Sequence, residues 1–208
     1  MIETLLSSYR SVILLNGNKP SHQMLKKIRK NIPIIAADGA AAYCSADYIV
    51  GDMDSTNEVH YENAEVIPIF DQNTTDFEKA MNFAKEKDLL PSLVMGISGG
   101  EIDHSLGNIQ ALLKHAEGSS LFFLDKHEKG LKIGIPLSRG KYPIKMKVGA
   151  TVSIFPYCTC TLTTNGLFWE LNNQLINPDG LLTIRNRSTK KLVKFNLIEG
   201  KALIIIDL

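Results

Sequence analysis

The spacing of hydrophobic residues divides the chain into two halves with different rhythms. Over roughly the first 120 residues, short apolar segments rich in β-branched residues alternate with longer stretches in which apolar residues recur every three or four positions. The first pattern is typical of buried strands and the second of amphipathic helices. The predicted strands are Ser11–Leu15, Pro33–Ala37, Tyr48–Val50, Glu65–Phe70 and Ser92–Ile97, and the predicted helices are Ser21–Lys30, Thr75–Lys87 and Asp103–His115. Such alternation favours a mainly parallel sheet with helices on both faces.

From about residue 130 onward, strand-like segments follow one another with no convincing amphipathic helix between them. Turn-forming Gly, Pro and Asn residues separate the segments, which is typical of a sandwich or barrel. The predicted strands are Lys132–Leu137, Tyr142–Met146, Thr151–Phe155, Thr159–Thr163, Gly166–Leu171, Leu181–Arg185, Leu192–Leu197 and Ala202–Asp207. We therefore predict a Rossmann-like α/β domain over residues 1–127 and an all-β sandwich domain over residues 128–208, with a hinge near Asp125–Gly130.

Composition narrows the class of protein without naming a reaction. The 208 residues are 44% hydrophobic and 22% charged, which is typical of a globular protein. A formal net charge of +1 gives no general attraction to nucleic acid or membrane surfaces. The first residues lack the features of a signal peptide, and no apolar stretch approaches the ~20 residues that span a bilayer. We expect a cytoplasmic protein whose three cysteines are reduced thiols.

The most specific local pattern is a pair of aspartates directly after a predicted strand. Asp52 and Asp54 follow Gly51 at alternate positions. In an extended backbone, both carboxylates would point to one side, about 7 Å apart at Cα. They would repel each other unless a cation lay between them, and Mg²⁺ prefers such oxygen ligands. The alternative is a turn in which Asp54 and Ser55 cap the next segment.

Two further acids lie near the same predicted edge of the sheet. Thr75 and Glu78 form a capping box that predicts the start of a helix. Asp76 then lies in the first turn, where the helix dipole favours a carboxylate even without a metal. Asp38 ends another strand and precedes Gly39 and alanines, which would let a ligand approach the backbone or, alternatively, a helix pack closely on the sheet.

Two small-residue turns complete the edge. Asn16-Gly17-Asn18 and Gly99-Gly100 each follow a predicted strand, and backbone N–H groups in such turns can bind phosphate, although a glycine pair is often only a tight connection. His104 could simply be a first-turn residue of the following helix. Because ligands bind at the carboxyl ends of strands in open α/β sheets, the acids and turns together predict a metal and polyphosphate site.

These motifs resemble those of the thiamine pyrophosphokinase family in order and spacing. The matching segments are Ala37–Ala40, Gly51–Ser55, Asp71–Asp76, Gly99–His104, Asn108 and Asn165–Leu171, the last similar to the family's G-L-x-W-x-L. The resemblance covers nearly the whole chain. It implies Mg²⁺-dependent transfer of pyrophosphate from ATP to the thiamine hydroxyl, giving thiamine diphosphate and AMP. It also implies a homodimer with active sites at the subunit interface.

The resemblance further implies roles for individual residues. Asp52, Asp54 and Asp76 would hold Mg²⁺, and these three with Asp103 are the expected catalytic residues; Asp103 and Asp76 are the candidate general bases. Gln72 would contact the thiamine pyrimidine, and Trp169 would stack on thiamine from the partner subunit, although a lone tryptophan more often packs in a core. The expected contacts to ATP or thiamine are Asn16, Gly17, Asp38, Gly39, Gln72, Thr75, Gly99, Gly100, His104, Asn108, Trp169, Thr183, Arg185 and Asn186.

Two residues depart from the family pattern. Glu101 replaces an arginine expected to face phosphate, and Arg185 replaces a serine between Thr183 and Asn186. Because the two changes have opposite signs, we hypothesise that Arg185 supplies, across the dimer, the charge that Glu101 removes. Two other functions use the same aspartates: a metal-dependent phosphohydrolase, and a nucleotide-sensing module that binds ATP without turnover.

Overall fold

The computed structural model of the chain describes residues 1–28, 31–54, 63–115, 120–127, 130–181 and 183–208. Contacts divide the chain into two compact units. The α/β unit comprises Tyr9–Ala111 and Phe123–Asp125, and the β unit comprises Met1–Ser8, Leu112–Phe122 and Lys126–Leu208. Parts of four predicted features lie outside the described residues. They are Ser55 of the aspartate motif, residues 29–30 of the first predicted helix, residues 128–129 of the predicted hinge, and Leu182 of a predicted strand.

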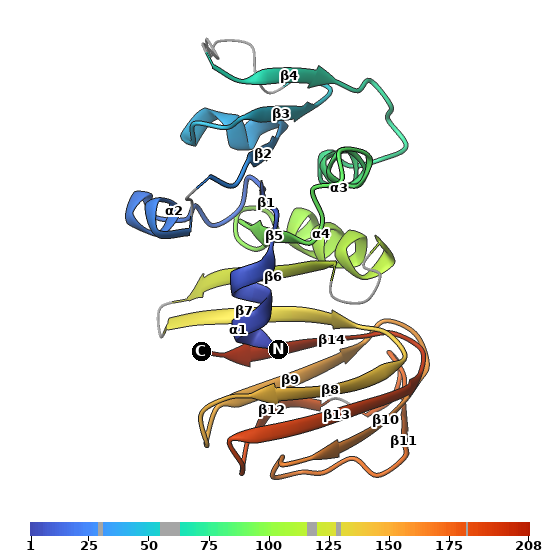
Figure 1. The fold of residues 1–208 in the computed structure, drawn as a ribbon. Coiled ribbons are helices and arrows are strands. Elements are labelled where there is room, and N and C mark those ends of the chain that lie inside the picture. The colour runs from blue at the N-terminus through green and yellow to red at the C-terminus, as the bar shows by residue number, and fades with distance from the viewer. Residues whose placement is uncertain (29–30, 55–62, 116–119, 128–129, 182) are drawn as a thin grey trace. The chain divides into compact units, whose positions relative to one another are not determined.

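A parallel sheet forms the centre of the α/β unit (Figure 1), as the sequence predicts. Its strand order is β4-β3-β2-β1-β5. The strands are β1 (Ser11–Leu14), β2 (Ile34–Ala37), β3 (Tyr48–Gly51), β4 (Glu65–Pro68) and β5 (Ser92–Met95). The helices are α2 (His22–Ile28), the 3₁₀ helix η1 (Asp38–Tyr43), α3 (Asp76–Glu86) and α4 (Ile102–His115).

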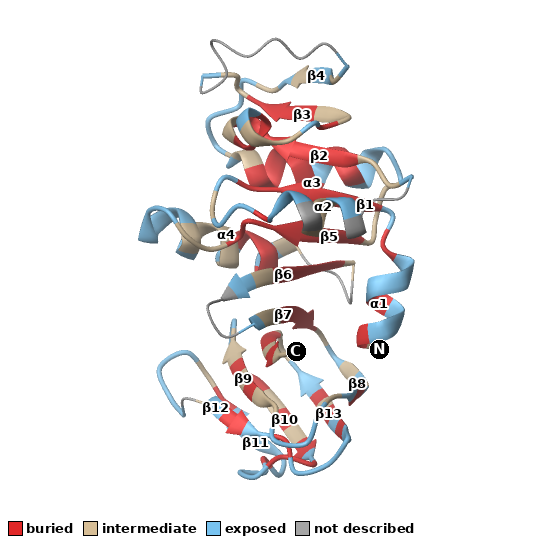
Figure 2. Cartoon of the chain, turned by 90° about the vertical axis from the view of Figure 1, so that its left-hand side faces the viewer, coloured by how far each residue is buried: buried red, intermediate tan, exposed pale blue. Residues whose placement is uncertain are grey.

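Burial explains why these segments form strands and helices. Every residue of β1, β2 and β5 is buried (Figure 2), as expected for parallel strands that are covered on both faces. Helix α3 buries Phe77, Ala80, Met81 and Ala84 at helical spacing, and it packs against β2 and β3. Its N-terminus carries the predicted capping box between Thr75 and Glu78, which places Asp76 at the first helical position.

The β unit is built from antiparallel strands, so that an α/β part is followed by a β part, as predicted. One strand order in this unit is β7-β14-β9-β12, and the other is β8-β13-β10-β11. Strand β6 is divided between the units, because its residues Phe123–Asp125 belong to the α/β unit. The strands are β6 (Leu121–His127), β7 (Gly130–Leu137), β8 (Gly140–Lys145), β9 (Thr151–Pro156), β10 (Cys160–Asn165), β11 (Gln174–Ile176), β12 (Thr183–Arg187), β13 (Leu192–Glu199) and β14 (Ala202–Asp207). Helix α1 (Ile2–Ser8) and strands β6 and β11 have no counterpart among the predicted elements.

The prediction of a strand over Gly166–Leu171 is wrong. This segment forms a turn around the side chain of Glu170. Oε1 of Glu170 accepts hydrogen bonds from the backbone N–H groups of Gly166 (2.6 Å) and Leu167 (3.1 Å), and Oε2 accepts one from Thr164 (2.7 Å). A carboxylate that binds nearby N–H groups competes with strand pairing for the same donors.

No helix in the described part of the chain has the length and hydropathy needed to cross a bilayer.

Candidate metal and polyphosphate site

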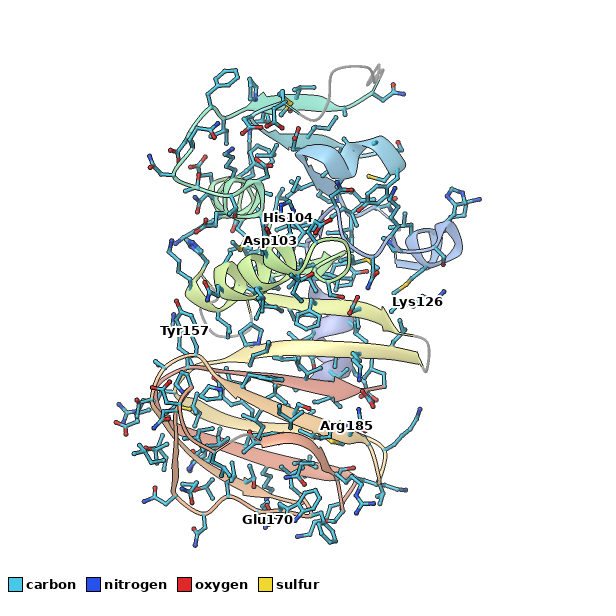
Figure 3. The ribbon with its side chains drawn as sticks, turned by 180° about the vertical axis from the view of Figure 1, so that it is seen from behind. Asp103, His104, Lys126, Tyr157, Glu170 and Arg185 are labelled. Carbon is cyan, nitrogen blue, oxygen red and sulfur yellow. The ribbon has the colours of Figure 1, made fainter. Side chains whose placement is uncertain are left out.

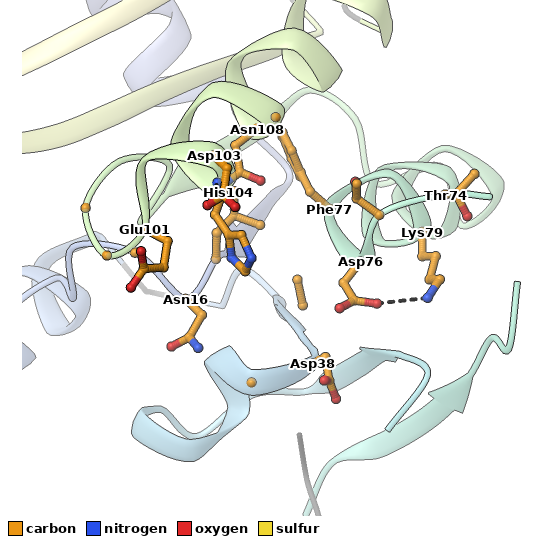
Figure 4. A pocket seen from close by; sticks show the side chains of 18 of the residues that line it. Asn16, Asp38, Thr74, Asp76, Phe77, Lys79, Glu101, Asp103, His104 and Asn108 are labelled. Carbon is orange, nitrogen blue, oxygen red and sulfur yellow. Dashed lines mark hydrogen bonds and ion pairs between the residues drawn. The ribbon is translucent and has the colours of Figure 1, made fainter. Parts of the chain in front are cut away.

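A pocket of about 460 Å³ opens at the carboxyl ends of the parallel strands, and all of its lining residues belong to the α/β unit (Figure 4). The segments that follow β1, β2, β3 and β5 meet there with the first turns of α3 and α4. This is the edge where the sequence predicts a site. The lining residues are Leu15, Asn16, Gly17, Ala37, Asp38, Gly39, Asp52, Thr74, Thr75, Asp76, Phe77, Lys79, Gly99, Gly100, Glu101, Asp103, His104, Gly107 and Asn108.

Three aspartates converge in this pocket. Asp38, Asp52 and Asp76 each offer a carboxylate oxygen, and these oxygens lie within 4.8 Å of one another. A set of three closely spaced carboxylate oxygens fits a hard divalent cation such as Mg²⁺. Asp38 is only 2% exposed and has a φ of 30°, a left-handed conformation that Asp tolerates better than most residues. The sequence placed Asp38 at this edge as a contact for ATP or thiamine, but did not predict it as a metal ligand.

Asp54 does not belong to this group of three carboxylates. The chain turns after Gly51, because Met53 has a φ of 67° and the backbone N–H of Asp54 points to Oδ1 of Asp52 (3.4 Å). The extended geometry expected for Asp52 and Asp54 is therefore absent, and Asp54 is exposed. Its role as a metal ligand stays a prediction from the family resemblance.

Lys79 is the charged residue at this site that the sequence analysis missed. Its ammonium group lies 2.9 Å from Oδ1 of Asp76 and 3.4 Å from Oδ2 of Asp52, and its side chain is 3% exposed. Burial acts to lower the pKa of Lys79, but the hydrogen bonds and charges of the two aspartates outweigh it and raise the pKa. Lys79 is therefore a cation within the acidic group. The available signal was its position three residues after Asp76 on one helix face.

Several hydrogen-bond donors stabilise the ionised form of Asp52. Burial alone would raise its pKa, but the backbone N–H of Asp54, the charge of Lys79 and the amide of Gln72 together lower it. Nε2 of Gln72 lies 3.2 Å from Oδ2 of Asp52. Asp52 is consequently ionised at neutral pH, which is the form that binds a metal.

The two small-residue turns run side by side and bond to each other. The N–H of Gly17 donates to the carbonyl of Gly96 (3.1 Å), and the N–H of Asn18 donates to the carbonyl of Ser98 (2.5 Å). These two N–H groups are therefore already used, in contrast to the expectation that the turn offers free donors to phosphate. A β-carbon on Gly17 would lie 2.2 Å from the Ser98 carbonyl oxygen, so only glycine permits this contact.

Helix α4 brings three predicted residues to the pocket. Asp103 and His104 are exposed in the first turn of α4 (Figure 3), and Oδ1 of Asp103 accepts a hydrogen bond from the His104 N–H (2.8 Å). Asn108 donates to the carbonyl of Ile97 (3.3 Å). Glu101 also lines the pocket, where Lys79 is the only lysine or arginine among the described lining residues. The site is thus strongly acidic.

The remaining predicted residues lie in the β unit. Trp169 is 57% exposed, so the alternative of a core tryptophan is wrong, and its ring packs edge-on against Phe168 with centroids 4.9 Å apart. Asn186 is buried and fixes the backbone of Trp169 from both sides, accepting from its N–H (3.1 Å) and donating to its carbonyl (2.7 Å). Thr183 donates to the carbonyl of Ile154 (2.5 Å).

Arg185 has a φ of 58°, and its side chain is exposed. Burial acts to raise the pKa of Asp207, but Lys132, Thr151 and the nearby charge of Arg185 together lower it. Arg185 belongs to the β unit and Glu101 to the α/β unit. The hypothesis that Arg185 of one subunit supplies the positive charge that Glu101 removes in the other stays a prediction.

Comparison with known proteins identifies relatives of both units. Residues 24–123 match the family model "Thiamin pyrophosphokinase, catalytic domain", and residues 141–200 match "Thiamin pyrophosphokinase, vitamin B1 binding domain". Thiamine pyrophosphokinase 1 of Oryza sativa subsp. japonica is 30% identical over 171 residues, covering 71% of this chain and 61% of its own length. The chain spans 61%, 60% and 57% of the first three curated relatives.

Solved structures show the same fold. The crystal structure of thiamine pyrophosphokinase from Bacillus subtilis has a TM-score of 0.75 at 24% identity, covering 94% of this chain and 97% of that one. The thiamin pyrophosphokinase of Candida albicans has a TM-score of 0.77 at 19% identity, covering 99% of this chain and 90% of that one. Since both family models match in consecutive parts of the sequence, the chain belongs to the thiamine pyrophosphokinase family.

Proposed function

We propose that the chain is a thiamine pyrophosphokinase, which transfers pyrophosphate from ATP to the hydroxyl of thiamine and forms thiamine diphosphate and AMP. The observation that carries this proposal is the convergence of Asp38, Asp52 and Asp76 within 4.8 Å, in a pocket of a chain that belongs to this family. The activity, the substrates and a cytoplasmic homodimer are all parts of the proposal.

Asp38, Asp52 and Asp76 would hold Mg²⁺, which would neutralise charge on the phosphates during transfer. Asp54, one residue beyond the turn at Met53, is the further ligand that the family resemblance suggests. ATP carries about four negative charges, and without a cation the acidic pocket would repel it. The three carboxylates would hold that cation, and the cation would supply the positive charge that the phosphates need in this pocket.

The other pocket residues position the substrates. Asn16, Gly17, Gly39, Thr75, Gly99, Gly100, His104 and Asn108 line the space available to the nucleotide, except that the N–H of Gly17 is already bonded to Gly96. The thiamine hydroxyl must lose a proton as it attacks the β-phosphorus, and Asp103 and Asp76 are the carboxylates proposed to accept it. Gln72, held against Asp52, would contact the pyrimidine.

The β unit would bind the vitamin. An exposed tryptophan face suits thiamine, because the thiazolium is a cation and the pyrimidine is flat; the cation–π interaction contributes about 0.5–2 kcal/mol. Trp169, supported by Phe168 and fixed by Asn186, provides such a face. We propose that residues 128–208 form a thiamine-binding and dimerisation sandwich, that residues 1–127 form the catalytic domain, and that Trp169 together with Thr183 and Arg185 serves the active site of the partner subunit.

One assay tests this function against its two alternatives. The protein is incubated with ATP, Mg²⁺ and thiamine, and AMP and thiamine diphosphate are quantified. Equal amounts of both products, formed only when thiamine is present, are expected. Release of phosphate or pyrophosphate without thiamine would indicate the phosphohydrolase, and nucleotide binding without any product would indicate the sensing module.

A further inference from the structure

Lys79 lies where a cation would be needed to hold the acidic group together. Its ammonium lies 2.9 Å from Oδ1 of Asp76 (Figure 4) and 3.4 Å from Oδ2 of Asp52. Asp52 and Asp76 are two of the three aspartates whose oxygens converge. The ammonium is buried, since only 3% of the side chain is exposed. Without Lys79, these carboxylates would lie close together and repel one another. No other lysine or arginine is found among the described residues that line the pocket.

An ammonium group and a divalent cation that bind the same carboxylate oxygens repel each other, which weakens the binding of the metal. Oδ1 of Asp76 and Oδ2 of Asp52 are the atoms on which Lys79 acts. A metal ion that takes them loses part of its electrostatic gain to repulsion from the nearby ammonium, or must displace it. Displacement leaves a buried ammonium without a partner, which is unfavourable unless another anion replaces the aspartates.

The phosphates of a nucleotide are such an anion. Lys79 is the only lysine or arginine among the described residues that line the pocket, and the same pocket contains the glycine turn at Gly99 and Gly100. A triphosphate bound there would offer oxygens to the ammonium, and Asp52 and Asp76 would then be released to the metal. Nucleotide and metal would each favour binding of the other, because such coupling is reciprocal.

We propose that Lys79 is a built-in counter-cation that competes with divalent metal for Asp52 and Asp76, and so makes tight metal binding depend on the nucleotide. Lys79 is in this role a positioning residue: it keeps the ligands in place before the substrates arrive and moves to phosphate when they do. The inference rests on the metal site of the proposed function, but it needs neither thiamine nor turnover.

The test is a titration of the 208-residue chain with Mn²⁺ followed by electron paramagnetic resonance, with and without an ATP analogue in which a methylene group replaces the α,β-bridging oxygen. We expect Lys79→Met to bind Mn²⁺ at least about fivefold more tightly than the unaltered protein when no nucleotide is present. The gain in Mn²⁺ affinity that the analogue gives the unaltered protein should shrink in Lys79→Met. Lys85→Met, an exposed lysine on the same helix, is the matched control and should change neither affinity.

Two further measurements separate competition from a structural role. Lys79→Arg retains the charge and should keep Mn²⁺ affinity low. The melting temperature of Lys79→Met should fall in EDTA and recover with Mn²⁺, whereas loss of mere packing would not recover. If Lys79→Met does not fold, Lys79→Gln replaces it in the titration.

Unchanged or weaker Mn²⁺ binding in the folded neutral variant, without nucleotide, would overturn the inference. A nucleotide effect of equal size in Lys79→Met and the unaltered protein would also contradict it. Failure of the proposed function looks different: tighter Mn²⁺ binding in Lys79→Met together with no thiamine-dependent AMP would uphold the competition and reject the kinase.

Discussion

Gly51 lies so close to Asp38 that a β-carbon at position 51 would come within 2.6 Å of the Asp38 Cβ atom. The same β-carbon would lie 3.2 Å from Oδ1 of Asp76. The glycine that ends β3 therefore allows two acids from other parts of the chain to approach Asp52. Its place in the motif before Asp52 is explained by space, since the φ of Gly51 is not among the positive values.

Gly51→Ala should disturb the acidic group more than the fold. The added methyl group has backbone and Cβ atoms as neighbours, which cannot simply rotate away, and overpacking of this kind costs about 1–3 kcal/mol. We expect at least a tenfold loss of Mn²⁺ affinity and of thiamine diphosphate formation. Val66→Ala on the neighbouring strand β4, where Val66 is 41% exposed, controls for a general loss of stability. Equal metal affinity in Gly51→Ala and Val66→Ala would contradict this explanation.

Replacement of single aspartates tests the composition of the metal site. Asp52→Asn removes a carboxylate of the convergent group and should abolish turnover and weaken Mn²⁺ binding at least tenfold.

The family resemblance predicts that Asp54→Asn also abolishes turnover while the fold stays intact. Circular dichroism checks the fold, and the two assays above check the site. Near-normal activity of folded Asp54→Asn would remove Asp54 from the metal ligands and leave Asp38, Asp52 and Asp76.

Trp169 offers an optical test of the proposed thiamine site, because it is the only tryptophan in the chain. We expect thiamine to quench its fluorescence. Trp169→Ala should raise the KM for thiamine roughly 2- to 30-fold, which corresponds to cation–π energies of about 0.5–2 kcal/mol, with a smaller effect on kcat. An unchanged KM would show that thiamine binds elsewhere.

Asn186 should affect thiamine binding through Trp169. Its side chain bonds the N–H and the carbonyl of Trp169, so Asn186→Ala frees the backbone that carries the ring. We expect a higher KM for thiamine and a broader, red-shifted emission of Trp169. Asn172→Ala, at an exposed position in the same turn region, is the control. Identical spectra of the two variants would argue against the positioning role.

The buried thiol of Cys160 should make stability depend on pH. Burial, with the nearby Cys158 and Glu199, raises the pKa of Cys160 from 9.0 to about 11. Between these values the unfolded thiol loses its proton while the folded one keeps it, so the unfolding free energy falls as pH rises. Between pH 8 and 10.5 it should fall by about 1–2 kcal/mol more in the unaltered protein than in Cys160→Ala. Cys158→Ala, which alters an exposed free thiol, should retain most of the slope. Parallel curves for the unaltered protein and Cys160→Ala would refute the assignment.

Local sequence patterns predicted the parts of the fold that depend on local interactions. The five parallel strands and the capping box at Thr75 follow from burial periodicity and from hydrogen bonds between residues close in sequence. The strand predicted over Gly166–Leu171 is wrong for an instructive reason. Its apolar residues fit a strand, but the carboxylate of Glu170 takes the N–H groups that pairing would need.

The acidic site was predictable in its location and only partly in its members. Strand ends meet at one edge of a parallel sheet, so Asp38, Asp52 and Asp76 could be placed there from the sequence. Which of them converge depends on the turn at Met53 and on the close contact at Gly51, and neither leaves a pattern in the sequence. From the sequence alone, Lys79 resembles a solvent-exposed lysine of an amphipathic helix. Its contacts with Asp52 and Asp76 become visible only when the structure shows that the end of β3 lies beside the start of α3.

The central claim is that Asp38, Asp52 and Asp76 hold the divalent cation that binds the nucleotide. Anomalous diffraction from crystals grown with Mn²⁺ and the methylene analogue of ATP tests it most directly. The account predicts an anomalous peak for a Mn²⁺ ion that is bonded to all three carboxylates and to a phosphate oxygen. A nucleotide bound in this pocket with no peak at these carboxylates, or with Mn²⁺ held by other residues, would contradict it.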